Sequence, residues 1–330
     1  MRIFITGGTG YIGTRLTEKL AGLGNEIVIL ARDPDKGIKL DNITYVKGDI
    51  LDVEAIRKGM TGCELVFHMA AYTKPWSKDK TLPYITNVTG TKNVIEAAIG
   101  NGVRKIVITS TGGTMSYSRD GLAVNETTNK SAQFHTEYER TKAEAETMAI
   151  DYSRDGCDIS IVNPTRVYGP GIISKSNFLT FIISKYLAGK WRIMPGDGKS
   201  IGNYVFIDDV VNGHILAGKK GRRGERYILG GENLSFSEVA EIISEESGIR
   251  RKLFPFPFAA IRFIIGLSAL YSFIFGAAPF MTREWLEKYS KNWIVSSEKA
   301  IRELGYKITP FRTGVAETIR WIKTKQSQNG

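Results

Sequence analysis

Residues 2–24 read RIFITGGTGYIGTRLTEKLAGLG, and this stretch decides the fold. A run of β-branched and apolar residues predicts a strand, which leads through a glycine-rich turn into an amphipathic helix. Gly7, Gly10 and Gly13 let the backbone bend tightly and approach a pyrophosphate at the helix N-terminus. A glycine triplet also occurs in ordinary turns, but between a strand and a helix it predicts a dinucleotide site. We expect the cofactor to contact Gly7, Thr9, Gly10, Tyr11, Ile12 and Gly13.

Strand-like and helix-like segments alternate from this turn to DISIVN at residues 158–163. Strands separated by helices imply right-handed crossovers and hence a parallel sheet. The predicted fold class is therefore α/β: a Rossmann-type doubly wound parallel sheet with a smaller, mostly helical C-terminal substrate lobe. The nucleotide domain is expected to span residues 1–168, with residues 201–228 returning to it. The substrate lobe is then made of residues 169–200 and 229–330.

The composition is ordinary for a globular protein with a large core: 330 residues, of which 42% are hydrophobic and 24% charged. The chain has only two cysteines, Cys63 and Cys157, and three scattered histidines, without the spacing of a metal site. We therefore expect no metal, no disulfide scaffold and a reducing compartment. The apolar run at the N-terminus is too short for a signal peptide, which predicts a cytoplasmic protein.

The net charge is +11 and the pI about 9.4, so an anionic partner is expected. The basic residues are spread along the chain, with short clusters at residues 219–223 and 250–252. No aromatic-basic interleaving and no nucleic-acid module is present in the sequence, so we expect no nucleic-acid partner. A phosphate-rich cofactor or an anionic membrane surface accounts for the charge.

The end of the second predicted strand discriminates between the two nicotinamide cofactors. An acidic residue there binds the ribose 2′-hydroxyl, whereas an arginine accommodates a 2′-phosphate. This chain has Ala31 at the acidic position, and Arg32 follows it. The sequence therefore favours NADP over NAD, although Asp33 offers a carboxylate for NAD.

Two Tyr-x-x-x-Lys pairs occur, Tyr138 with Lys142 and Tyr186 with Lys190. One helical turn places phenol and ammonium side by side. A cation lowers the phenol pKa from its usual value of about 10, so such a pair can move a proton to or from a substrate oxygen. About one such spacing is expected by chance in a chain with this many tyrosines, so spacing alone does not choose between them.

The chain carries a set of motifs that, together, resembles the extended short-chain dehydrogenase/reductase family. Within it the chain is most similar to the dihydroflavonol reductase-like branch, in particular plant farnesol dehydrogenases, through DGLAVNE, TEYERTKAEAE, GERYILGGEN and the apolar C-terminal segment. The family motifs are GGTGYIG, GDILD with Asp49, HMAA (68–71), NVTGTKNV with Asn87, TSTGG, YERTK (138–142), NPTRVYGPG (163–171) and YVFIDDVVNGHILA (204–217).

The resemblance selects Tyr138 and Lys142 as the catalytic pair, because they follow a strand that ends in a Ser/Thr cluster. Tyr186 lies beyond NPTRVYGPG and has a glycine inside its motif, so we predict that it is a packing residue. Thr111 matches the position of the family's catalytic hydroxyl. Ser110 is the alternative, and it would point to the opposite side if the strand continues.

The mechanism implied by the resemblance is hydride transfer between the nicotinamide and a substrate carbinol or carbonyl carbon. Tyr138 is expected to act as the acid or base, and Lys142 to lower the Tyr138 pKa and hold the nicotinamide ribose. Thr111 would hydrogen-bond the substrate oxygen. Asn87 matches a proton-relay position, with helix packing as the alternative.

Further cofactor contacts are implied by the resemblance. Asp49 and Ile50 would flank the adenine, and Pro164 and Val167 would lie near the carboxamide. The alternative for these residues is a loop or core role. The remaining expected contacts are Ala70, Ala71 and Thr109.

Residues 263–282 form a stretch of 20 residues without a charge. That length can span a bilayer, but the stretch contains two Gly, two Ser, a Tyr and a Pro, and family-like sequence resumes after it. We favour a buried or lid segment around an apolar substrate, then a peripheral membrane contact through residues 254–281. A transmembrane helix is the least favoured alternative. The segment predicts a hydrophobic substrate such as an isoprenoid, a sterol-like compound or a flavonol.

The sequence is compatible with three functions. The first is an NAD(P)-dependent alcohol dehydrogenase or ketone reductase acting on a hydrophobic small molecule. The second is a nucleotide-sugar epimerase or dehydratase that uses the same residues with bound NAD. A nucleotide-binding regulator without catalysis is disfavoured, because the chain has both Tyr138 and Lys142. A homodimer through paired helices is an expectation from the family.

Overall fold

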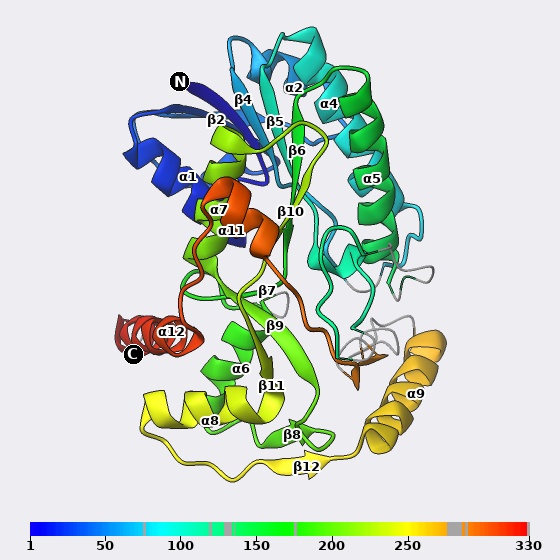
Figure 1. The fold of residues 1–330 in the computed structure, drawn as a ribbon, viewed down its shortest axis with the longest axis vertical. Helices are drawn as coiled ribbons and strands as arrows, with labels where there is room; N and C mark the ends of the chain where they lie inside the picture. The colour runs from blue at the N-terminus through cyan, green and yellow to red at the C-terminus, as the bar shows by residue number, and fades with distance from the viewer. Residues whose placement is uncertain are drawn as a thin grey trace.

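Seven parallel strands form the large sheet at the centre of the molecule (Figure 1). Their order across the sheet is β10-β6-β5-β4-β1-β2-β3, and every neighbouring pair is parallel. The predicted doubly wound parallel sheet is therefore confirmed. The strands are β1 (Arg2–Thr6), β2 (Glu26–Ala31), β3 (Ile43–Lys47), β4 (Leu65–His68), β5 (Lys105–Thr109), β6 (Ile159–Pro164) and β10 (Arg226–Leu229).

Both faces of this sheet are buried, as parallel sheets require. Successive side chains of a strand point to opposite faces. In β1, Ile3 and Ile5 belong to one hydrophobic core, and Phe4 belongs to the other. The strands consequently read as continuous apolar runs rather than as alternating ones, which explains why the sequence pattern identifies them.

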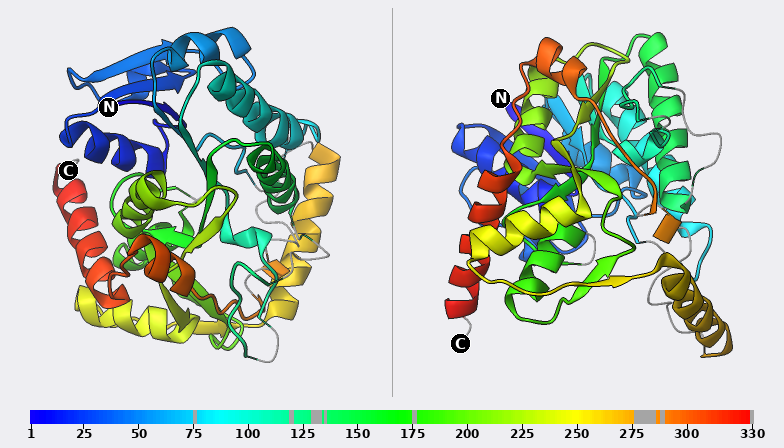
Figure 2. Two further views of the ribbon diagram at one scale, coloured as in Figure 1. Left: turned by 45° about the horizontal axis from the view of Figure 1, so that its top comes forward. Right: turned by 60° about the horizontal axis from the view of Figure 1, so that its bottom comes forward.

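Helices cover the two faces in separate layers (Figures 1 and 2). One layer consists of α2 (Val53–Met60), α4 (Gly90–Gly100) and α5 (Glu137–Arg154). The other consists of α1 (Tyr11–Gly22), α7 (Ile207–Lys220) and α11 (Glu298–Leu304). Four short helical segments connect the elements: η1 (Pro34–Lys36), α3 (Leu82–Tyr84), the π-helix η2 (Ile85–Thr89) and η3 (Gly112–Thr114).

A second, smaller lobe follows the large sheet and contains two small sheets. In the first, β9 pairs in parallel with β7 and antiparallel with β11, and in the second β12 pairs with β8. The elements of this lobe are β7 (Arg166–Tyr168), α6 (Phe178–Leu187), β8 (Ile193–Pro195), β9 (Ile201–Phe206), β11 (Glu232–Ser235), α8 (Phe236–Ser247), β12 (Phe254–Phe256), α9 (Phe258–Phe275) and α12 (Phe311–Gln328).

The segment expected to return to the nucleotide domain, residues 201–228, divides between the two parts. Its strand β9 lies in the three-stranded sheet, whereas α7 packs on the large sheet and β10 forms the edge of that sheet. Helix α11, expected in the substrate lobe, packs on α7 and β10. Sequence order does not reveal these placements, because each depends on which apolar face meets which partner.

The structure describes residues 1–74, 77–118, 121–128, 134, 136–174, 177–275, 286–287 and 290–328. Within these residues, no helix combines the length and apolar character that crossing a bilayer requires. Helix α9 covers the first part of the uncharged segment 263–282, and the rest of that segment lies outside the described residues.

Candidate active site

The glycine turn between β1 and α1 lies against the loop that follows β4. Gly7 has a φ of +73°, and a Cβ there would lie 2.7 Å from the backbone nitrogen of Ala70. A Cβ on Gly13 would lie 2.0 Å from the carbonyl oxygen of Gly7. Only glycine fits at these two positions, so the turn is closed tightly and is held against Met69 and Ala70. The cofactor contact expected of Ala71 stays a prediction.

The beginning of α1 fits the pyrophosphate of a dinucleotide. Gly10 is the N-cap of α1, and no side chain caps the helix. The N–H groups of the first turn have no partner inside a helix and favour an anion. Tyr11 uses its side chain elsewhere, because its hydroxyl donates to the carbonyl oxygen of Gly169 at 2.9 Å. The predicted cofactor contact of Tyr11 therefore falls to its backbone, and the contacts predicted for Thr9 and Ile12 stay predictions.

The ends of β2 and β3 carry the residues predicted to bind the adenosine part. Arg32 has an exposed side chain that pairs with Asp49 at 3.8 Å. The Asp33 carboxylate pairs with Lys36 at 2.9 Å, and this contact lowers the Asp33 pKa. The acidic alternative for NAD is thus already paired with a cation, and Arg32 stands exposed next to it.

Ile50 and Thr109 contact the protein core rather than open space. Ile50 is buried, and its side chain fills the space beside Gly90, where a Cβ would lie 2.6 Å from it. The Thr109 hydroxyl and a His214 ring nitrogen are 2.8 Å apart. Pro164 is buried at the end of β6, and Val167 is half-buried in β7. The cofactor contacts predicted for these residues stay predictions.

Thr111 and Tyr138 come together at the carboxyl end of β5. Thr136 caps α5 by accepting a hydrogen bond from the Glu139 N–H at 3.1 Å, which sets Tyr138 in the first turn of the helix. The Thr111 Oγ1 accepts from the Gly113 N–H at 3.1 Å, and the Thr111 side chain lowers the pKa of the Tyr138 phenol. The alternative, Ser110, is buried, and its hydroxyl has no hydrogen-bond partner among the described residues.

The Tyr138 pKa differs from the sequence expectation. Burial, followed by the Glu139 carboxylate, raises it to about 12, and the hydrogen bond with Thr111 is the interaction that lowers it. The expected decrease caused by Lys142 is not present in the protein itself, because desolvation of the phenol outweighs the interactions that favour the phenolate. Lys142 is itself buried, at 1% exposure, and burial lowers its pKa to about 8.

Glu146 lies one helical turn beyond Lys142, and its charge raises the Lys142 pKa. Its carboxylate is buried and accepts hydrogen bonds from Thr114 at 2.9 Å and from Asn163 at 2.6 Å. Arg226 of β10 approaches the other carboxylate oxygen at 3.5 Å. Glu146 is not among the site residues predicted above. A signal for it is present in the sequence, because Tyr138, Lys142 and Glu146 follow each other at a spacing of four residues, which places them on one helix face.

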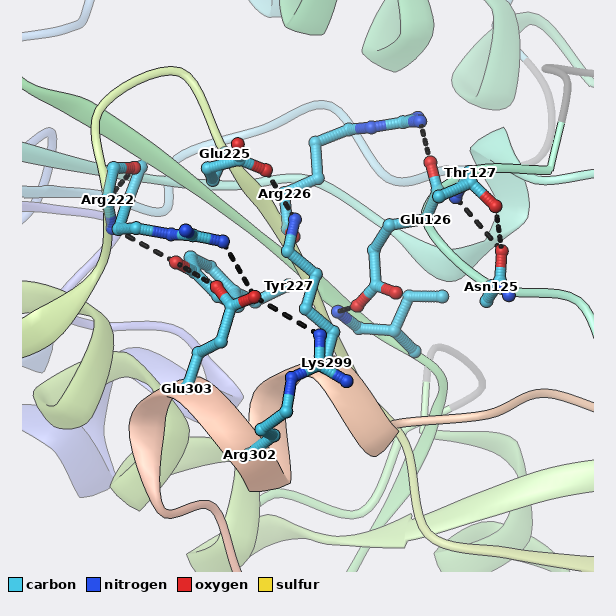
Figure 3. A network of polar contacts seen from close by, with 12 residues as sticks. Asn125, Glu126, Thr127, Arg222, Glu225, Arg226, Tyr227, Lys299, Arg302 and Glu303 are labelled. Carbon is cyan, nitrogen blue, oxygen red and sulfur yellow. Dashed lines mark hydrogen bonds and ion pairs between the residues drawn. The ribbon is translucent and has the colours of Figure 1, made fainter.

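Arg226 belongs to a larger polar network that joins β10 to α11 (Figure 3). Its guanidinium also donates to the backbone carbonyl of Glu126, while the Glu126 carboxylate accepts from the Ile228 N–H at 2.8 Å. From α11, Lys299 donates to the Arg226 carbonyl oxygen at 2.9 Å. The network holds strand β10 in place, and from this strand the Arg226 side chain extends to the buried Glu146 of α5.

Asn87 is fully buried in the π-helix η2, and both polar atoms of its side chain hydrogen-bond other residues of the protein. Its side-chain oxygen accepts from the Tyr72 N–H at 2.7 Å. Its amide nitrogen donates to the Tyr72 carbonyl at 3.2 Å and to the Thr141 hydroxyl at 2.9 Å. These contacts fasten the loop after β4 to α5 and support the helix-packing alternative. The proton relay stays a prediction.

His68 connects this region to the glycine turn. Thr6 accepts from the N–H groups of Met69 and Ala70, both at 3.2 Å, so its hydroxyl donates to His68 Nδ1 at 2.7 Å. Because Nδ1 accepts this bond, the neutral ring carries its proton on Nε2, which donates to the Thr91 hydroxyl at 2.9 Å. Burial lowers the His68 pKa to about 3, so the ring is neutral and structural.

Tyr186 packs in the core, as predicted. It is 2% exposed and its hydroxyl donates to the Ile249 carbonyl at 2.7 Å, while Lys190 is exposed. The second Tyr-x-x-x-Lys pair is thus separated into a core residue and a surface residue.

Comparison with known proteins identifies the family. The model of the NAD dependent epimerase/dehydratase family matches residues 3–230. The chain belongs to this family. Epimerase/dehydratase-family proteins of this kind are extended short-chain dehydrogenases/reductases, so the predicted resemblance is confirmed.

Two relatives and one solved structure are similar to this chain over nearly its whole length. A putative dihydroflavonol 4-reductase of Synechocystis is 30% identical over 97% of this chain and 94% of its own length. Sterol demethylase protein B of Methylococcus capsulatus is 28% identical over 98% of this chain and 99% of its own length. The structure of UDP-glucose 4-epimerase from Thermotoga maritima has a TM-score of 0.82 at 21% identity, over 99% of this chain and 100% of that one, and shows the same fold.

The glycine turn of this epimerase/dehydratase-family protein can be tested with Gly13→Ala. The added Cβ would lie 2.0 Å from the Gly7 carbonyl oxygen, so the turn has to open. We expect the Kd of NADH or NADPH, measured by calorimetry, to rise by roughly tenfold or more, which corresponds to about 1.4 kcal/mol.

Gly22→Ala is the matched control. Gly22 is the last residue of α1, and a Cβ there has no neighbour within 4 Å. This variant should bind the nucleotide normally and be as stable as the original or more stable by about 0.5–1 kcal/mol. Equal nucleotide affinity in both variants would contradict a cofactor role for the turn.

Proposed function

We propose that the protein is an NADP-preferring oxidoreductase that interconverts a hydroxyl and a carbonyl group on a hydrophobic small molecule. The observation that carries the proposal is the convergence of Thr111 and Tyr138 at the carboxyl end of β5, where the Thr111 hydroxyl lowers the pKa of the Tyr138 phenol, with Lys142 one helical turn further on. These residues lie at the carboxyl ends of the parallel strands, as the glycine turn does. Ligands of doubly wound sheets bind at that edge.

The bound nicotinamide would supply or accept the hydride. In reduction, Tyr138 Oη gives its proton to the substrate oxygen, and in oxidation it accepts the proton of the alcohol. Thr111 Oγ1 accepts from the Gly113 N–H, and the Thr111 side chain favours the phenolate form of Tyr138 by lowering its pKa. Lys142 holds a charge beside this site at pH values below its pKa of about 8.

The preference for NADP is supported by the cations at the ends of β2 and β3. Arg32 is 85% exposed and its pair with Asp49 is long, at 3.8 Å, whereas the Lys36 ammonium lies 2.9 Å from the Asp33 carboxylate. A 2′-phosphate would gain charge-assisted hydrogen bonds from such groups. A ribose 2′-hydroxyl would need an acidic partner, and Asp33 is already paired.

A hydrophobic substrate is supported by the apolar character of the second lobe and by the relatives. The names of the two curated relatives refer to a dihydroflavonol and to a sterol. Helix α9, which carries no acidic side chain, lies on the same side of the molecule as the N-terminal end of α5, where Tyr138 is located (Figures 1 and 2).

A nucleotide-sugar epimerase or dehydratase is the second candidate, because the family includes these activities and the UDP-glucose 4-epimerase has the same fold. Such an enzyme would interconvert sugar nucleotides without net consumption of its cofactor. Incubation with UDP-sugars, followed by NMR, separates it from the proposed oxidoreductase.

Tyr138→Phe should abolish turnover, because it removes the only proton that the phenol can exchange. We expect kcat to fall by about 10²–10⁴-fold while NADPH still binds. The measurement is NADPH oxidation with farnesal and a panel of hydrophobic ketones and aldehydes.

Tyr186→Phe is the control for Tyr138→Phe. It removes a buried hydroxyl that bonds Ile249, so it should change the free energy of unfolding and leave kcat unchanged. Unchanged kcat in Tyr138→Phe would disprove the proposed mechanism, and so would turnover of UDP-sugars alone.

Arg32→Ala should weaken the binding of NADPH and leave the binding of NADH unchanged. Loss of a charge-assisted contact to the 2′-phosphate is worth about 1.5–3 kcal/mol, so the KM for NADPH should rise roughly tenfold to a hundredfold, with NADH unaffected. The control, Arg57→Ala, removes an exposed arginine that pairs with Glu54 on α2. It should change neither the KM for NADPH nor the KM for NADH. An equal effect on both nucleotides would argue against the NADP preference.

Glu146→Gln should shift the pH profile of kcat/KM. The Glu146 charge raises the Lys142 pKa, so its removal lowers that pKa, and Lys142 loses its charge at a lower pH. If the Lys142 charge supports the reaction, the falling alkaline limb moves to lower pH. Glu144→Gln, at the half-exposed neighbour that pairs with Arg140, should leave the limb in place. A uniform loss of rate without a shift of the limb would show a purely structural role.

A further inference from the structure

Strands β8 and β12 and helix α9 form one outer edge of the second lobe, which we name the β8–β12–α9 edge (Figures 1 and 2). This edge leaves large apolar side chains in contact with solvent, each between 44% and 69% exposed. They are Ile193, Phe254, Phe263, Ile264 and Leu267.

The backbone places these apolar side chains on a continuous strip. In the parallel β8–β12 pair, Ile193 and Phe254 are direct partners, so their side chains lie on the same face of this small sheet. Helix α9 begins two residues after β12. Its exposed Phe263 and Leu267 are four residues apart and share one side of the helix, whereas Ile265 points inward and is buried.

The chain around this strip is cationic. The sequence has no Asp or Glu within residues 159–196 or within residues 248–283. Lys190, Arg192, Arg250 and Lys252 are exposed at the ends of β8 and β12.

Individual contacts place these charges beside the apolar strip. The Lys252 ammonium lies 5.6 Å from the centre of the Phe254 ring, and the Arg192 carbonyl accepts from the Phe254 N–H at 2.9 Å. Among the described residues, Asp197 pairs with Lys199 and Glu287 pairs with Arg262 at the border of the edge. Helix α8, which packs against β8, adds Glu238 and Glu241 on its own side. Lys190, Arg192, Arg250 and Lys252 form no ion pair within the described part of the chain, so they leave positive charge beside the strip.

We propose that the β8–β12–α9 edge docks on the surface of an anionic lipid bilayer. Exposed aromatic and aliphatic side chains flanked by lysine and arginine are the combination that binds the interface of a membrane. The cations are attracted to anionic headgroups and the apolar side chains enter the boundary of the acyl region. Helix α9 then lies along the bilayer surface. This inference goes beyond the proposed activity and does not depend on it.

Flotation with lipid vesicles tests the docking. The full-length protein should bind vesicles of phosphatidylcholine mixed with phosphatidylglycerol, should bind pure phosphatidylcholine much more weakly, and should be released by salt. The double substitution Phe263→Ser with Leu267→Ser should lower the binding at least about tenfold. Because both side chains are exposed, the variant should keep its thermal stability.

Controls separate the edge from the rest of the surface. Leu23→Ser changes an exposed leucine at the end of α1 and should bind vesicles like the original protein. Arg192→Ala with Lys252→Ala should lower binding to the anionic vesicles and leave the weak binding to phosphatidylcholine unchanged. Absence of binding to the anionic vesicles overturns the proposal. Self-association that the Phe263→Ser/Leu267→Ser variant abolishes, with no vesicle binding, also overturns it and assigns the edge to a second copy of the chain.

Discussion

The contact between the backbone of Gly7 and the backbone of Ala70 is the constraint on which the site depends. A Cβ at Gly7 would lie 2.7 Å from the Ala70 nitrogen, so no side chain fits between the β1–α1 turn and the loop after β4. Thr6 and His68 also join these two segments, because the neutral His68 imidazole hydrogen-bonds the Thr6 hydroxyl on one side and the Thr91 hydroxyl on the other. Any movement of one segment therefore displaces the other. The predicted cofactor turn and the first residues after β4 are therefore held together by direct contacts.

Helix α5 brings charge into a buried position. Lys142 and Glu146 are both almost without solvent contact, and burying charges is costly unless they are paired and hydrogen-bonded. Thr114, Asn163 and Arg226 surround the Glu146 carboxylate, and the network of β10 and α11 holds Arg226 in place. Helix α11, far from Tyr138 in sequence, thus holds the strand that carries Arg226. The low Lys142 pKa and the high Tyr138 pKa share a cause, which is desolvation.

The sequence alone indicates candidate site residues wherever local geometry determines their arrangement. Gly7, Gly10 and Gly13 identify a strand-to-helix turn, and the four-residue spacing of Tyr138 and Lys142 identifies a helix face. The second such pair showed the limit of spacing, since Tyr186 is in the core. The sign of the Tyr138 pKa change was wrong, because burial depends on the packing of residues that are distant in sequence. Glu146 was missed for the same reason: its partners come from β6, β10 and η3.

The sequence by itself determined the parallel sheet and the family. Apolar runs of strand length and glycines with positive φ follow from local sterics, which each short segment carries within itself. Only the tertiary structure decided that β9 leaves the large sheet, that α11 packs on β10 and that the β8–β12–α9 edge stays exposed. An apolar segment is equally apolar in a core and on a surface. Whether it is covered depends on which other segments reach it, and that is a property of the complete fold.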